Sequence, residues 1–280
     1  MPTPEIPQFF SDPLTAAGLM ALAAQAGAYS LYWFLGDRAH RERAMEGFER
    51  LLISGVLFGI ALILVNLSLW GLNVYLDLAG VELPANSAIR ILNQTKGWQD
   101  FGANVQTALN IAASTYQSYV GAAWVILAGY MASVVGTGIL PWTAAVSMAI
   151  MNGLAYIVTA ATTILISAAV YGVAAAMAHG WPAFLSIGAV LVTYERTRNL
   201  GAWLLALSVV APVVLAAGAD VLKSAVPPSA LPDLRTATPV GAVPLILAMT
   251  LLGLIGLVLT VLSYAASRLF DHAGAHLALD

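Results

Sequence analysis

FGANVQTALNIAASTYQSYVGAAWVILAGYMASVVGTGIL, residues 101–140, holds no charged side chain and no proline. The uncharged run continues to Tyr194, and a second one covers Thr236 to Ser267. Charged side chains are rare in membrane helices because burying them in lipid is costly. One crossing of the hydrocarbon core needs about 20 mostly apolar residues, so these runs predict helices that cross a membrane.

The composition extends this prediction to the whole chain. Hydrophobic residues make up 60% of the 280 residues and charged residues 9%, whereas an ordinary globular chain is about a quarter charged. We therefore expect residues 1–280 to form a single integral membrane domain. The predicted fold is an all-α, polytopic transmembrane helical bundle of about six to seven spans.

The spans follow from the apolar runs. Residues 103–140 predict one helix, which at 1.5 Å per residue reaches about 57 Å. With the next run it forms a long central helical hairpin, bent at residues 140–142. The chain is expected to turn at residues 179–182, so the 11-residue run after this turn either crosses as a short tilted helix or re-enters. The predicted runs are Leu14 to Leu35, Leu51 to Leu72, Ala103 to Leu140, Trp142 to Met177, Ala183 to Thr193, Gly201 to Ala219 and Val243 to Leu269.

The connections carry most of the charge. Residues 36–50 predict a cytosolic loop with a short surface helix, because i to i+4 pairs such as Glu46 with Arg50 favour one. Residues 73–102 predict an external cap, and residues 220–239 form a proline-rich loop.

The distribution of basic residues predicts the orientation. Cytosolic connections carry an excess of Lys and Arg. If residues 36–50 are cytosolic and residues 183–193 cross, the N-terminus lies outside, the C-terminus lies in the cytosol, and the protein is a multi-pass protein of the plasma membrane. The inner set is then larger than the outer one: Arg38, Arg41, Arg43, Arg50, Arg196, Arg198 and Arg268 against Arg90, Lys96, Lys223 and Arg235.

Two patterns suggest contacts beyond lipid. Gly55 and Gly59 have the spacing that lets two membrane helices approach closely. The first half of the predicted 103–140 helix carries a neutral polar stripe, which either packs on the external segment or other helices or lines a pore. The stripe comprises Asn104, Thr107, Asn110, Ser114 and Gln117.

No pattern of residues indicates an enzyme. The chain has no cysteine, its four histidines are scattered, and we find neither paired carboxylates nor a phosphate-binding glycine loop. We therefore expect no catalytic residue, metal or cofactor. Ion-coupled carriers usually bury an ionisable group in a helix interior, and the predicted helices have none.

The turn of Glu195, Arg196 and Arg198 is the most distinctive charged cluster between apolar helices. It is either a cytosolic turn anchored by positive charge or a contact for a cytosolic ATPase or a phosphate backbone.

A resemblance bears on this turn. Residues 184–191, FLSIGAVL, and 197–207, TRNLGAWLLAL, resemble the pattern G-x-x-L, basic turn, T-R-x-x-G-x-x-L-x-A of archaeal CedA-like DNA-import membrane proteins. Their relatives are the polytopic TrbL-type channel subunits of conjugative type IV secretion systems. The chain departs from the pattern at Tyr194 and Glu195, where proline or further basic residues are expected. The resemblance covers roughly a tenth of the chain.

The resemblance implies a homo-oligomer in the plasma membrane, beneath a pilus. Its implied partners are a HerA-like hexameric ATPase and small pilin-like membrane proteins, with DNA as the transported substrate. The favoured hypothesis is a membrane subunit of a DNA-transfer machine, forming part of its translocation channel or pilus assembly platform. The alternatives are a small-solute permease or channel and an assembly factor without a pore.

Overall fold

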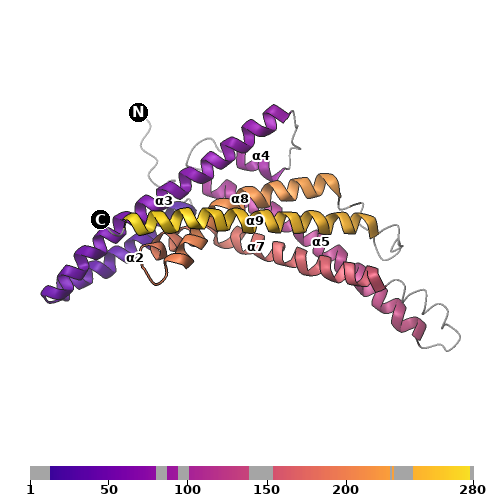
Figure 1. Cartoon of the computed structure of the whole chain (residues 1–280), viewed down its shortest axis with the longest axis horizontal. Coiled ribbons are helices and arrows are strands. Elements are labelled where there is room, and N and C mark those ends of the chain that lie inside the picture. Colours follow the sequence, from indigo (N-terminus) through magenta and orange to yellow (C-terminus); the bar gives the residue numbers. More distant parts are fainter. Residues whose placement is uncertain are drawn as a thin grey trace, which may run out of the picture.

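The computed structural model describes residues 13–79, 87–93, 101–138, 154–227, 229 and 242–277. This part of the chain forms seven helices and confirms the all-α prediction (Figure 1). The helices are α2 (Pro13–Leu35), α3 (Arg38–Ala79), α4 (Ala88–Asn93), α5 (Phe101–Gly138), α7 (Leu154–Val192), α8 (Arg198–Ala225) and α9 (Ala242–Leu277).

Four of these helices, α3, α7, α8 and α9, are long and apolar enough to span a membrane. They also expose large apolar side chains, which is the surface that lipid requires. Leu52 of α3 and Leu165 of α7, for example, are each 71% exposed. The prediction of a multi-pass membrane protein is therefore supported at the level of four spans among the described residues.

Helix α3 corrects the predicted boundary between a charged loop and a second span. It begins at Arg38 and runs without a break to Ala79, so residues 38–50 are its first turns and not a separate surface helix. The chain has no proline between Arg38 and Ala79, and nothing else there stops a helix. The first seven residues of the predicted external cap, 73–79, also belong to α3.

The long helix predicted at residues 103–140 is confirmed as α5. It packs along α7, and the two extend together to the lower right of Figure 1, beyond the end of α8. The predicted helical hairpin therefore exists as a packed pair. Its bend at residues 140–142 lies outside the described residues.

The turn predicted at residues 179–182 is wrong, because α7 continues through it to Val192. Pro182 lies inside the helix. Its ring removes one backbone hydrogen bond, but the neighbouring Trp181 is fully buried and its indole donates to the Ser208 carbonyl of α8 at 2.7 Å. Residues 183–193 are therefore neither a separate short helix nor a re-entrant piece.

Helix α8 is also longer than predicted. It begins at Arg198 and ends at Ala225, so Asp220 and Lys223 lie in the helix and not in a proline-rich loop. Helix α9 continues to Leu277, eight residues past the predicted end. Residues 228 and 230–239 of the predicted loop lie outside the described part of the chain.

Contacts between the helices give their directions. Tyr116 and Tyr119 of α5 donate to the carbonyls of Leu215 and Leu222 in α8, so these two helices run parallel. Trp181 bonds to Ser208, whereas Gly188 lies against Gly201, so α7 runs antiparallel to α8.

Ser87 and Phe101, which lie before and after residues 94–100, are at different levels of α8. Ser87 bonds to Asp220 of α8, whereas the Phe101 ring lies 6.0 Å from Trp181, which bonds to Ser208. Asp220 and Ser208 are twelve residues apart on α8, about 18 Å along its axis. Phe101 therefore begins α5 nearer to the start of α8 than Ser87 lies.

Candidate functional site

The neutral polar stripe lies on the outer face of α5. Thr107, Asn110, Ser114 and Gln117 are exposed, and Asn104 at the edge of the stripe is half-buried. The opposite face of α5 is buried against α7 and α8, with Leu109, Tyr116 and Tyr119 fully enclosed. The stripe therefore points away from the bundle formed by one chain.

The stripe lies at the depth of an apolar helix. Since Tyr116 bonds to Leu215 and α5 runs parallel to α8, Asn110 is level with the middle of α8. Helix α8 is long and apolar enough to cross a membrane. A polar side chain at this depth needs a polar partner or water, because lipid offers neither.

The hydroxyl groups of the stripe satisfy this need within their own helix. Thr107 donates to the Ala103 carbonyl at 2.8 Å and Ser114 to the Ile111 carbonyl at 2.9 Å. The amides of Asn110 and Gln117 have no hydrogen-bond partner among the described residues. These two amides are therefore the groups of the stripe that have no partner in the described part of the chain.

A second polar region lies at the end of the bundle where α7 meets α8. Tyr194 bonds to the Tyr29 hydroxyl of α2, and the Arg50 guanidinium of α3 lies 5.4 Å from the centre of the Tyr194 ring. Burial raises the pKa of the Tyr194 hydroxyl, and the bond with Tyr29 adds to the shift. These contacts bring the turn at residues 193–197 beside the charged start of α3.

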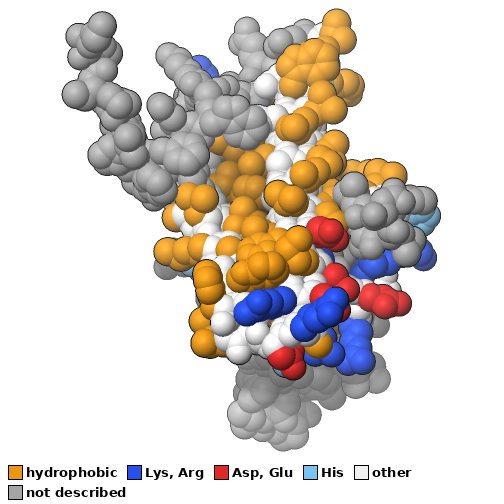
Figure 2. Space-filling model, turned by 90° about the vertical axis from the view of Figure 1, so that its left-hand side faces the viewer, with side chains coloured by type: hydrophobic (Ala, Val, Ile, Leu, Met, Phe, Trp, Pro, Cys, Tyr) orange, Lys and Arg blue, Asp and Glu red, His pale blue; other side chains and the backbone are white. Residues whose placement is uncertain are grey.

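The basic residues of this end form a surface that we call the arginine end. It comprises the charged start of α3, the turn before α8 and the last turns of α9. Helix α9 reaches this end because Gly274 lies against Val192, the last residue of α7. Figure 2 shows Lys and Arg side chains gathered with acidic ones in the lower part of this view, beside hydrophobic surface. The predicted inner arginines are thus on one end of the molecule: Arg38, Arg41, Arg43, Arg50, Arg196, Arg198 and Arg268.

The predicted turn residues differ in exposure. Glu195 and Arg196 are exposed, whereas Arg198 is half-buried and its Nε has no partner among the described residues. The Thr197 hydroxyl donates to the Leu191 carbonyl at 2.9 Å and ties the turn to the end of α7. Arg196 is therefore the arginine of this turn that a partner can reach directly.

The structure separates the two predicted features. The stripe lies on α5, level with the middle of α8, and the turn lies at the arginine end. They do not form one site within a single chain.

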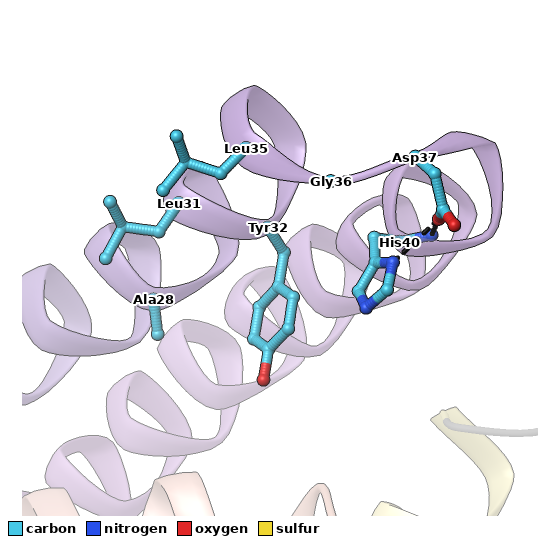
Figure 3. Close-up of a pocket in the computed structure, with 7 residues that line it drawn as sticks. All are labelled: Ala28, Leu31, Tyr32, Leu35, Gly36, Asp37 and His40. Atoms are coloured by element: carbon cyan, nitrogen blue, oxygen red, sulfur yellow. Dashed lines mark hydrogen bonds and ion pairs between the residues drawn. The ribbon is translucent and has the colours of Figure 1, made fainter.

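A recess of about 520 Å³ opens at the corner between α2 and α3. Its walls are mostly apolar, and its polar side holds Asp37 and His40, whose Nδ1 lies 2.7 Å from the carboxylate (Figure 3). The Tyr32 ring stacks on His40 at 6.0 Å. Among the described residues no group of three His, Cys, Asp or Glu could hold a metal ion.

The half-buried Asp220 makes a contact that was not predicted from the sequence. Its carboxylate accepts bonds from the Ser87 hydroxyl at 2.6 Å and from the backbone N–H groups of Ala88 and Ile89. The carboxylate therefore fixes the start of α4 against α8. A charged residue following the uncharged run 201–219 was the available signal, but its partner lies more than 130 residues away.

The packing glycines also differ from the prediction. No atom lies within 4 Å of a Cβ built at Gly55 or Gly59, so within one chain this pair brings no helices together. The close approach is between Gly188 of α7 and Gly201 of α8. A Cβ at Gly201 would lie 2.7 Å from the Leu191 carbonyl carbon and 2.9 Å from the Gly188 oxygen. Packing of Gly55 and Gly59 against another chain stays a prediction.

Comparison with known proteins identifies no relative. No family model, curated protein or solved structure matches the chain.

Proposed function

We propose that this protein is a non-catalytic subunit of an oligomeric membrane machine that transfers DNA. The observation that carries the proposal is the outward position of the polar stripe on α5. In lipid, the Asn110 and Gln117 amides would lose their hydrogen bonds to water, at a cost of about 1 to 3 kcal/mol each on the scale measured in proteins. A neighbouring subunit or a water-filled passage avoids this cost.

The proposed topology has six crossings, by α2, α3, α5, α7, α8 and α9. The chain also returns toward the cytosolic side between α3 and α5, and this seventh passage, in place of the one expected at residues 183–193, puts the two termini on opposite sides. The arginine end is cytosolic, because it holds seven of the eleven basic residues. This orientation places the N-terminus outside and the C-terminus in the cytosol of a plasma membrane protein.

The identity of the substrate rests on the resemblance around Gly188 and residues 197–207. In this proposal the exposed Arg196 contacts a HerA-like hexameric ATPase or the phosphate backbone of DNA at the cytosolic face. Small pilin-like membrane proteins are the further partners that the resemblance implies.

The alternative, a small-solute permease or channel, requires polar groups that face a pathway inside one chain. The stripe points the other way, and the interior face of α5 is closed by Tyr116, Tyr119 and Leu109. The outward stripe therefore favours an assembly of several chains.

Two measurements test the proposal. In lipid nanodiscs, native mass spectrometry should give an oligomer, and a monomer that moves a small solute in liposomes would contradict the proposal. In host cells lacking the protein, wild type should restore DNA transfer, whereas Arg196→Gln should restore it poorly. Arg90→Gln is the matched control, because Arg90 is exposed on the short helix α4, away from the arginine end.

A further inference from the structure

We infer that α5 pairs in parallel with α5 of a second copy of this chain, through one exposed line of residues. This line, the α5 seam, comprises Ala103, Thr107, Asn110, Ser114, Gln117 and Gly121. The inference rests on the proposed function in that it names which surface joins two subunits. All six residues are exposed in the single chain.

The seam runs straight along one face of α5. Its residues recur at intervals of four, three, four, three and four, an average of about 3.6, so they form one line parallel to the axis of a straight helix. From Ala103 to Gly121 the seam is about 27 Å long, close to the thickness of a hydrocarbon core. A contact of this length is available to one straight partner helix.

The shared membrane orientation of two copies determines whether their α5 helices run parallel or antiparallel. When two copies inserted in the same orientation form a closed pair, a twofold axis along the membrane normal relates them, so their α5 helices run parallel and identical residues meet. The seam must therefore be complementary to itself. Each amide of Asn110 and Gln117 carries both donors and an acceptor, so each can bond to its own copy.

The other seam residues fit the same partner. Ala103 and Gly121 are small, and the Thr107 and Ser114 side chains are short, so two backbones can approach closely. No seam residue is charged, so the pairing brings no like charges together. A polar Asn in such a seam also fixes its register, because a shifted helix would leave the amide unpaired.

The polarity of its exposed side chains distinguishes the seam from the apolar surfaces of the other helices. Helices α3, α7 and α9 expose large apolar residues such as Ile63 at 58%, Leu165 at 71% and Leu254 at 53%. Lipid covers these side chains without cost, whereas it would leave the amides of the seam without hydrogen bonds. The second copy is the occupant that supplies matching groups.

Disulfide trapping tests the inference directly, because the natural chain has no cysteine. Single cysteines at residues 103 to 121 of α5 are oxidised in liposomes, and the covalent dimer is measured. Cysteines form a disulfide when their Cα atoms lie about 4.4 to 6.8 Å apart. We expect strong dimers at the seam positions and weak ones between them, with Ile63→Cys and Leu165→Cys as exposed controls that do not cross-link.

A second variant measures the energy of the contact. Asn110→Leu should weaken dimerisation in bilayers by about threefold to tenfold, the range for one or two interhelical hydrogen bonds in a membrane. Leu254→Ala changes an exposed lipid-facing residue and should leave dimerisation unchanged.

The outcomes separate the seam from the proposed function. An oligomer in nanodiscs without periodic cross-links at the seam overturns the inference and leaves the proposed function standing. Seam cysteines that react with a membrane-impermeant maleimide and do not cross-link also overturn it, because the stripe then lines water. Periodic cross-links in a protein whose loss leaves DNA transfer unchanged support the seam and contradict the proposed function.

Discussion

The α7–α8 half and the α2–α3 half of this molecule use the same residue types in opposite ways. In the first, Gly188 and Gly201 bring two backbones into contact, and 61% of the residues in the apolar stretch of α8 are buried. In the second, Gly55 and Gly59 face open space, and the apolar part of α3 is 22% buried. A small-residue pair therefore allows helices to approach, but the neighbouring elements decide whether they do.

The largest expected effect tests this comparison at the glycines. Gly201→Ala places a methyl group against the backbone of Val192, Leu191 and Gly188, which cannot move aside cheaply. We expect a loss of about 1 to 3 kcal/mol in the free energy of unfolding, as overpacked cores show. Gly55→Ala should be neutral or stabilise α3 by up to about 1 kcal/mol, because alanine favours a helix.

Unfolding in mixed detergent micelles compares these two variants. Equal free energies of unfolding for Gly201→Ala and Gly55→Ala would show that the α7–α8 crossing is no tighter than the open glycine pair.

Two capping aspartates extend the comparison. Asp220 is half-buried on α8 and holds three groups at the start of α4, whereas Asp37 is exposed at the start of α3. Asp220→Asn keeps one acceptor oxygen but removes the charge from these bonds, and it should cost about 1 kcal/mol, the difference between a hydrogen bond to a charged group and one to a neutral group. The effect should be local, because α4 has only six residues.

Hydrogen exchange of residues 87–93 measures this effect, with the exposed Glu49→Gln of α3 as control. Faster exchange of α4 in Asp220→Asn alone is the expected result. Unchanged exchange would mean that the buried Ala88, Ile89 and Leu92 hold the segment without the carboxylate.

Helices α5 and α7 were predictable from the sequence to different degrees. Helix α5 was predicted closely because no proline interrupts it, and helix signals act locally. The break predicted at Pro182 was wrong because the burial of Trp181 and the Gly188–Gly201 contact stabilise α7 from outside its own sequence. The local sequence does not show the packing of a neighbouring helix, so Pro182 indicated a turn that the contacts with α8 prevent.

The candidate site was predictable only in part, for the same reason. Helical spacing placed Thr107, Asn110, Ser114 and Gln117 on one face, and the structure places them there. Spacing could not tell whether that face was covered by the same chain. Nor could it connect Asp220 with Ser87, since the two are far apart in sequence and no local pattern links them.

The smallest effect concerns Asp37 at the open corner of α3. Its carboxylate accepts bonds from the backbone N–H of His40 at 3.1 Å and from the His40 ring, and these bonds lower the pKa of Asp37. A lowered pKa in the folded state stabilises the first turn above the ordinary carboxyl pKa of about 3.9, and this contribution is lost as the pH falls through the lowered value. His40→Ala should raise the pKa of Asp37 toward its ordinary value, as measured by a carboxyl-carbon NMR titration in detergent. Because the corner is exposed, global unfolding should not change with this variant, whereas a shared change would mean that the α2–α3 corner is coupled to the packed half.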